Sequence, residues 1–354
     1  MVGAMRIPLV LVILGGLAHA DPLQITSANL EHNGAINVAA GDKQFLVLWE
    51  EQEAAHLGTR HLAAAIVDET GKLVVGPTRY LDGGGMPNDV HAVWTGTAFT
   101  VAICNEHWGD DHRIVWGTLD AKLAWTQQGE WKRKADDGYQ LYCSNAAPSG
   151  GGGMVLAVTA TQEIEDGGGG LTQTCGSWHM LIVGTKLTDG RRVDVCGVTA
   201  IDKDYLIGSD PKHRLVAATA KKQIVVLRKD DVVAKIASPE LVALEAGGFV
   251  VYRPGGKPVA SKPVAMAKGP IGAAQVDRVF AIGDQLGLEA HTPTGLELAI
   301  YKRDGSLARA DIVSKANMVQ HRCTAGAGAI LCAWQSQDKK TLTGDIFVQR
   351  LALP

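Results

Sequence analysis

Short apolar runs recur along the chain, and Gly, Asp and Asn residues separate them. No stretch keeps a 3.6-residue apolar period over three turns, so the pattern predicts β-strands almost throughout. One unit recurs: a strand of small residues, a tight turn and a strongly apolar strand, which we name strands a and b. Its clear examples are 37–50, 92–106, 145–160, 207–220, 278–292 and 323–335.

A second unit follows most of these segments. It consists of an apolar strand, a turn rich in Asp and Gly, and another strand, which we name strands c and d. The turn residues suit the positive-φ positions of tight hairpins. Its examples are 61–75, 113–125, 179–195, 223–236 and 296–312.

Four antiparallel strands that recur as one unit are typical of a propeller blade. Segment 241–272 holds one poorer candidate, and counting it gives seven units of about 48 residues. We therefore predict an all-β fold, a single β-propeller with seven four-stranded blades, and keep six blades as the alternative. The clear units start near Ile36, Val90, Tyr142, Tyr205, Val276 and Met318.

The two ends of this repeat complement each other. The last unit has strands a and b, then 345–354 as strand c, and no strand d follows. Residues 23–32 form an extra strand before the first unit. This strand can complete the last blade and remove an open edge. We therefore predict a propeller closed by its N-terminal strand.

Two segments carry a resemblance. GDKQFLVLWE (41–50) and WTGTAFTVA (94–102) are similar to the repeats of secreted bacterial β-propeller proteins, which are built on Gly-x-x-Phe-Leu-Val-x-Trp and carry a signal peptide. Only the first and last units keep Trp after strand b, as Trp49 and Trp334. The resemblance implies a fold and export, and it implies no shared catalytic residues.

The first twenty residues have the pattern of a signal peptide. Arg6 precedes an apolar run at 7–18, and Ala18-His19-Ala20 fits the small-x-small cleavage rule. We expect residues 1–20 to be a leader and 21–354 to be the propeller domain, secreted or periplasmic; an uncleaved anchor is the alternative. No later run reaches the roughly 20 apolar residues of a membrane span.

Composition narrows the class of protein. A net charge of −3 with 46% hydrophobic residues fits neither a disordered chain nor a nucleic-acid binder. Six cysteines in an exported chain predict disulfides, with free thiols as the alternative. Placing the strands favours the local pairs Cys104–Cys143, Cys175–Cys196 and Cys323–Cys332.

The loops between strands b and c are longer and chemically richer than the a–b turns. Function commonly lies on loops that a rigid scaffold holds, so we expect a site on this b–c face, near the propeller axis. The alternative is that these loops carry only solvated charges.

The candidate ligand-binding residues lie mainly in one such loop. A histidine with nearby carboxylates could ligate a metal, but the spacing matches no known ligand motif, so we predict neither a metal nor a cofactor. A plain polar loop is the alternative. The candidates are Glu106, His107, Trp108, Asp110, Asp111 and His112, with His56 and His291 on corresponding loops.

We interpret the chain as an exported, monomeric binding or interaction protein, with a protein or glycan as its partner and no nucleic acid. No catalytic residue can be assigned. The alternative is a carbohydrate-active enzyme, a glycosidase or polysaccharide lyase. That alternative predicts two carboxylates, or a histidine with a carboxylate, converging near the axis with shifted pKa values.

Overall fold

Consecutive strands pair in antiparallel meanders, as the alternation of apolar runs and turns predicts. A computed structural model of the protein describes residues 21–26, 30–31, 35–53, 60–80, 86–106, 112–133, 140–165, 171–188, 190, 192–210, 215–219, 224–226, 241–245, 248–254, 264–266, 277–292, 295–316, 318–338 and 343–354. Within these ranges, no helix is long and apolar enough to cross a membrane.

Among the described residues, six blades contain four strands each, and we number them along the chain. The first contains β3 (Ile36–Ala40), β4 (Gln44–Glu53), β5 (Arg60–Asp68) and β6 (Leu73–Tyr80). The second contains β7 (Met86–Trp94), β8 (Phe99–Glu106), β9 (His112–Leu119) and β10 (Trp125–Arg133). The third contains β11 (Gln140–Gly150), β12 (Gly153–Glu165), β13 (Leu171–Val183) and β14 (Lys186–Thr188), with the short β15 (Arg192–Val193) also paired to β13.

The remaining four-stranded blades follow the same order. The fourth contains β16 (Cys196–Ile201), β17 (Tyr205–Ser209), β18 (Leu215–Thr219) and β19 (Ile224–Val226). The fifth contains β23 (Arg278–Ile282), β24 (Gln285–Thr292), β25 (Gly295–Tyr301) and β26 (Leu307–Ser314). The sixth contains β27 (Met318–Gly326), β28 (Ala329–Ser336), β30 (Ile346–Ala352) and β1 (Leu23–Gln24).

The prediction of seven four-stranded blades is wrong, and the six-blade alternative is supported. Between the fourth and fifth blades lies a sheet of three described strands, β20 (Leu241–Glu245), β21 (Gly248–Pro254) and β22 (Val264–Met266). Its last pair is parallel, unlike the antiparallel c strand of a blade. The sequence between β21 and β22 contains Pro258 and Pro263, which lack the N–H group that a ladder needs.

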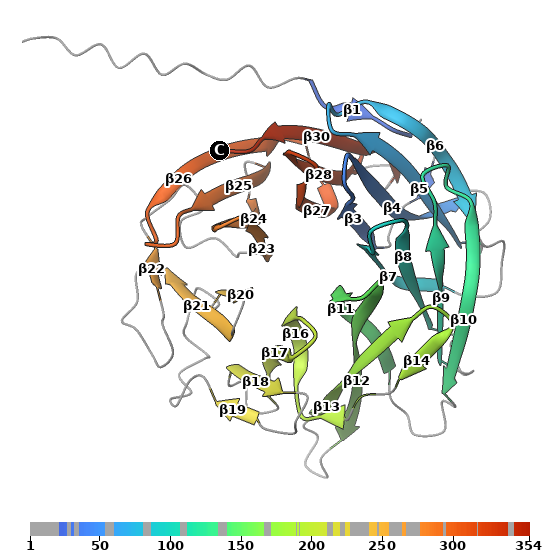
Figure 1. The fold of residues 1–354 in the computed structure, drawn as a ribbon, viewed down its shortest axis with the longest axis vertical. Coiled ribbons are helices and arrows are strands. Elements are labelled where there is room, and N and C mark those ends of the chain that lie inside the picture. The colour runs from blue at the N-terminus through green and yellow to red at the C-terminus, as the bar shows by residue number, and fades with distance from the viewer. Residues whose placement is uncertain are drawn as a thin grey trace, which may run out of the picture.

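The sheets surround a common axis (Figure 1), which defines a β-propeller. Figure 1 shows the first strand of each sheet innermost: β3, β7, β11, β16, β20, β23 and β27. Loops between second and third strands therefore leave the same face as the start of each innermost strand. The expected b–c face thus exists, and the innermost strands begin there.

The fourth blade begins one strand earlier than the sequence pattern indicates. We expected strand a near Tyr205 and placed Cys196 at the end of the preceding unit. In the structure Cys196 begins β16, the innermost strand of the fourth blade, and Tyr205 begins β17. Segment 196–201 alternates apolar with polar residues and lacks a Gly-Asp turn, so its pattern did not distinguish an inner strand from an outer one.

The N-terminal strand closes the ring, as predicted. β1 pairs antiparallel with β30, with Leu23 opposite Val348. Beyond β1, the Ile25 N–H donates to the Ile346 carbonyl at 2.8 Å. A second short strand, β2 (Leu30–Glu31), pairs with β4 and with β29 (Thr343–Gly344), so the first blade's sheet also contains a strand from the sixth unit. These pairs tie the two ends of the chain together.

The apolar core fills the spaces between neighbouring sheets. Trp49 is 1% exposed and packs with β28 and β30 between the first and sixth blades. Trp334 is also 1% exposed and packs between the fifth and sixth blades. Trp116 packs between the second and third blades, and Trp94 contacts the cluster between the first and second. Trp49, Trp116 and Trp334 are therefore core residues, and Trp94 packs against the core.

All six cysteines form the predicted pairs. Cys104–Cys143 joins β8 to β11, and Cys175–Cys196 joins β13 to β16, with Cα separations of 5.9 and 5.5 Å. Cys323–Cys332 crosses one hairpin between directly opposed residues. The first two bridges each link neighbouring blades. Three disulfides indicate that the protein folds in an oxidising compartment.

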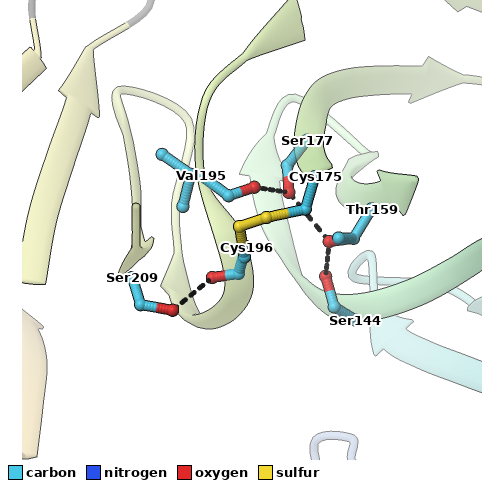
Figure 2. Close-up of a disulfide and its surroundings, with 7 residues drawn as sticks. All are labelled: Ser144, Thr159, Cys175, Ser177, Val195, Cys196 and Ser209. Atoms are coloured by element: carbon cyan, nitrogen blue, oxygen red, sulfur yellow. Dashed lines mark hydrogen bonds between the residues drawn. A yellow bond between two sulfur atoms is a disulfide. The ribbon is translucent and has the colours of Figure 1, made fainter. Parts of the chain in front are cut away.

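A row of hydroxyl groups lies beside the second bridge (Figure 2). Ser177 donates to the Val195 carbonyl at 2.6 Å, so Thr159, 2.8 Å from Ser177, must donate to Ser177. Ser144, 2.9 Å from Thr159, then completes the row across three strands of the third blade. The buried hydroxyls of Thr159 and Ser177 are thus satisfied, and the bond from Ser177 to Val195 holds the segment that leads into the fourth blade.

Candidate functional site

The predicted candidate loop connects β8 to β9, on the b–c face. His107, Trp108, Asp110 and Asp111 lie outside the described residues, and so does His56, between β4 and β5. Glu106 is the last residue of β8 and His112 the first of β9, and only their backbones are described. The convergence of these residues on one ligand stays a prediction.

His291 is the one candidate whose side chain the structure describes. It lies near the end of β24, at the b–c face, and is exposed. Its backbone N–H donates to Oδ2 of Asp277 at 2.6 Å. Its ring centroid lies 6.2 Å from that of His321, which belongs to the innermost strand of the next blade. His291 therefore lies beside a group of charged residues near the propeller axis.

His321 is held by two carboxylates. Its Nε2 lies 3.1 Å from Oδ2 of Asp277, and its Nδ1 lies 3.8 Å from Oε2 of Glu289. Burial lowers the pKa of His321, but the hydrogen bond to Asp277 and the charge of Glu289 outweigh this and raise it to about 9. Burial likewise raises the pKa of Asp277, and the hydrogen bonds from His321 and His291 outweigh it, so the net shift is downward. Both groups are therefore charged at neutral pH.

Glu289 links the fifth and sixth blades. It is 1% exposed on β24, and its Oε2 accepts the Cys323 N–H at 2.6 Å. Its other oxygen lies 3.8 Å from Nη1 of Arg278, which also donates to the Cys323 carbonyl at 3.3 Å. A carboxylate that receives a backbone N–H and faces two cations holds these neighbouring inner strands in register.

Arg322 is the least satisfied member of the group. It lies on β27, half-buried, and its Nε is buried with no hydrogen-bond partner. Burial lowers the pKa of its guanidinium, the charge of Arg278 lowers it further, and Glu289 and Asp89 oppose them. Asp89 lies on β7 of the second blade, two sheets away around the ring from β27. The electrostatic interaction between Arg322 and Asp89 therefore reaches past the first blade.

His91 marks the far side of the same group. It lies on β7, is 6% exposed, and its Nε2 is 2.6 Å from the Cys143 carbonyl. Burial lowers its pKa to about 3, and the charge of Arg322 contributes, against the hydrogen bond to Cys143. His91 is therefore neutral and donates from Nε2, whereas His321 is a cation. Two inner-strand histidines thus have opposite charge states because their neighbours differ.

We name the group formed by Asp277, Arg278, Glu289, His321 and Arg322 the axial charge cluster. At neutral pH its resolved shifts leave Asp277 and His321 in their charged forms, and arginine does not lose its proton in proteins. Such a set can bind and orient a polar ligand.

The axial charge cluster was missed from the sequence. Its signal is a pair of adjacent charged residues on each of two innermost strands: Asp277-Arg278 at the start of β23, and His321-Arg322 in the middle of β27. Knowing which strands are innermost requires the ring, so the two pairs cannot be matched from the repeat alone. Among the described residues, no group of three or more His, Cys, Asp or Glu is arranged to hold a metal.

The comparisons with solved structures agree with the fold. The chain is similar to a crystal structure of a protein of unknown function from Dyadobacter fermentans, with a TM-score of 0.54, 10% identity, and coverage of 95% of this chain and 99% of that one. It is also similar to a sialidase from Trypanosoma rangeli, with a TM-score of 0.51, 10% identity, and coverage of 92% of this chain. The chain spans 55% of the length of that sialidase.

At 10% identity these likenesses show the fold alone. No family model matches the sequence. No curated protein matches it either. The chain is thus a β-propeller, and the repeat type suggested by Gly-x-x-Phe-Leu-Val-x-Trp stays a prediction.

Proposed function

We propose that this β-propeller is an exported binding protein that takes a small polar ligand at the b–c end of its axis. The axial charge cluster is its floor and the exposed His291 its rim. The observation that carries the proposal is the convergence of three cations and two carboxylates from neighbouring inner strands. Charged side chains gathered at the centre of a rigid scaffold are what recognition of a polar molecule requires.

The charge states favour binding over the alternative, a carbohydrate-active enzyme. Acid/base hydrolysis needs one carboxyl group that is protonated at working pH, and its pKa must be raised. Here the pKa of Asp277 is lowered instead, and that of His321 is raised to about 9, which makes it a poor base at pH 7. Histidine and carboxylates do converge near the axis, as the enzyme hypothesis requires, but their shifts point away from proton transfer.

Export is part of the proposal. We infer that residues 1–20 are a leader and that the mature protein works in the periplasm or outside the cell. Three disulfides support this, because such bonds persist in oxidising compartments. The loop 107–111, with Glu106 and His112 at its ends, would stand over the same face and contribute further ligand contacts.

The test is a binding and turnover assay with one panel of ligands. The protein is applied to an array of neutral, acidic and amino sugars and short peptides, and bound compounds are then incubated with it in solution and analysed by mass spectrometry. We expect retention of a subset without chemical change, and loss of retention in His291→Ala. Lys203→Ala, an exposed substitution in the a–b turn of the fourth blade on the opposite face, is the matched control.

Three results would count against the proposal. Conversion of a retained sugar would favour the enzyme. Retention that Lys203→Ala abolishes and His291→Ala does not would place the site on the other face. If nothing on the panel is retained, the small-ligand function is wrong, and a protein partner becomes the hypothesis to pursue.

A further inference from the structure

We infer that the axial charge cluster recognises a carboxylate group of its ligand, through the guanidinium group of Arg322. This inference rests on the proposed function and adds the chemical class of the ligand. It starts from an imbalance within the cluster: each carboxylate has close partners, and one cation does not.

The carboxylates of the cluster are already engaged. Asp277 receives the His321 ring at 3.1 Å and the His291 N–H at 2.6 Å. Glu289 receives the Cys323 N–H at 2.6 Å, and Arg278 lies 3.8 Å away. Arg278 in turn donates to the Cys323 carbonyl at 3.3 Å. The carboxylates of this set are thus occupied by groups of the fifth and sixth blades. His321 Nδ1, 3.8 Å from Glu289, is buried without a hydrogen-bond partner, as Arg322 Nε is.

Arg322 differs from Arg278 in this respect. Its Nε–H is buried and meets no acceptor, and a buried donor without a partner costs about 1–3 kcal/mol. The nearby charge of Arg278 repels it, and the charges of Glu289 and Asp89 attract it. Its side chain is half-buried, so solvent reaches part of it. An unpaired guanidinium group at this position lowers the stability of the fold unless an acceptor pairs with it.

An anion is the group that would remove this penalty. Guanidinium presents its N–H groups as a planar fork, and the two oxygens of a carboxylate match that fork in spacing and plane. The protonated His321 and Arg278 add positive potential from the neighbouring positions without competing for the same oxygens. The exposed His291 ring, 6.2 Å from His321, offers a polar edge for the remainder of the ligand.

The probes are glucuronate, its neutral counterpart glucose, and inorganic phosphate, each titrated at low ionic strength and followed by calorimetry. The Nε–H resonances of arginine in ¹⁵N-labelled protein are recorded in the same titrations. We expect glucuronate to bind, to shift the Arg322 Nε–H signal, and to bind at least tenfold more tightly than glucose, about the strength of one charge-assisted hydrogen bond.

Two variants and one control sharpen the test. Arg322→Gln should weaken glucuronate binding at least about tenfold, and Arg322→Lys, which keeps the charge but loses the fork, should weaken it less. Arg303→Gln removes the same charge from an exposed turn between β25 and β26 and should leave binding unchanged. If Arg322→Gln does not fold, the Arg322 signal of the unaltered protein decides the question.

The outcomes separate this inference from the proposed function. Equal binding of glucuronate by Arg322→Gln and the unaltered protein, or phosphate binding at least as tight as glucuronate, overturns the carboxylate assignment. If a neutral compound binds and His291→Ala abolishes it while Arg322→Gln does not, the axial binding site stands and only the ligand class is wrong. If neither acidic nor neutral compounds bind, both proposals fail.

Discussion

The imidazole of His321 donates from Nε2 to Oδ2 of Asp277 at 3.1 Å, although the two residues lie in neighbouring blades and 44 positions apart. His321 is on the innermost strand of the sixth blade, and Asp277 directly precedes that of the fifth. The contact is therefore a brace between blades as well as part of the axial charge cluster. Its loss should be visible in the stability of the whole ring.

The first prediction is a loss of stability at alkaline pH. The pKa of His321 rises from 6.5 to about 9 on folding, so its contribution is complete below pH 6.5 and disappears as the pH rises through about 9. A shift of this size corresponds to about 3 kcal/mol of the free energy of unfolding. Urea denaturation at pH 6, 7.5 and 9.5 should show this decline, and His321→Gln should flatten it.

The matched control for this experiment is His179→Gln. His179 is also partly buried, and its Nε2 contacts a backbone carbonyl, that of Asp202, at 2.6 Å in place of a carboxylate. His179→Gln should leave the decline of the free energy of unfolding at alkaline pH unchanged. A decline that is equally steep in His321→Gln would show that the brace does not depend on the charge of His321.

Closure of the ring supplies a second prediction. Thr26 follows β1, and its Oγ1 accepts the buried Ile346 N–H at 2.9 Å. Thr26→Ala leaves this N–H without a partner and should lower the free energy of unfolding by about 1–2 kcal/mol. Thr26→Ser keeps the hydroxyl and should cost clearly less.

Amide hydrogen exchange at Ile346 gives the local readout of that closure. We expect exchange to accelerate in Thr26→Ala and to stay slow in Thr26→Ser. Equal exchange in both variants would mean that the backbone bond from Ile25 to Ile346 alone holds the terminus in place.

These features were not equally predictable from the sequence. The units starting at Ile36, Val90 and Tyr142 were placed correctly because each keeps both its Gly- or Asp-rich turns and its apolar b strand. Segment 241–272 has the apolar runs without the turn spacing, so counting apolar runs overestimated the blades by one. The pairs Cys104–Cys143 and Cys323–Cys332 followed from strand order. Cys175–Cys196 was predicted as a pair within the third unit, but in the structure it joins the third blade to the fourth.

The site was harder to predict than the fold. Loop 107–111 was predicted as a ligand-binding site because its polar residues are consecutive. The axial charge cluster instead combines residues that are far apart in the chain. Arg278 and Arg322 meet only because β23 and β27 are neighbours around the ring. The local sequence of β23 or of β27 does not indicate that the two strands are neighbours. His291 is the predicted candidate that the structure places beside the axial charge cluster.

The disulfides should differ in what they contribute. Cys104–Cys143 closes a separation of 39 residues between two blades, and Cys323–Cys332 closes one of 9 within a hairpin. Loop-closure entropy predicts stabilisation of about 4 kcal/mol for the first and about 2.5 kcal/mol for the second. Each bridge is removed by a double variant, Cys104→Ser with Cys143→Ser or Cys323→Ser with Cys332→Ser. The first double variant should have the lower denaturant midpoint. The reverse order would mean that core packing of Cys323 and Cys332 outweighs chain entropy.

Glu289 is expected to stabilise the ring more than any exposed acid, because it is the buried partner of several cations. Glu289→Gln keeps an acceptor for the Cys323 N–H but leaves Arg278 and His321 without their shared negative charge. Removing one partner of a buried ion pair costs about 3–5 kcal/mol, so the free energy of unfolding should fall by a similar amount. The control is Glu297→Gln, which alters a second buried carboxylate in the fifth blade. Its Oε1 accepts from Thr292 at 2.9 Å, and the substitution should cost less.

Glu289→Gln should also change ligand binding, because it raises the net positive charge around Arg322. We expect this variant to bind glucuronate more tightly than the unaltered protein while unfolding more easily. Lower stability with weaker binding would show instead that Glu289 positions the inner strands and that its charge does not oppose an anion at Arg322.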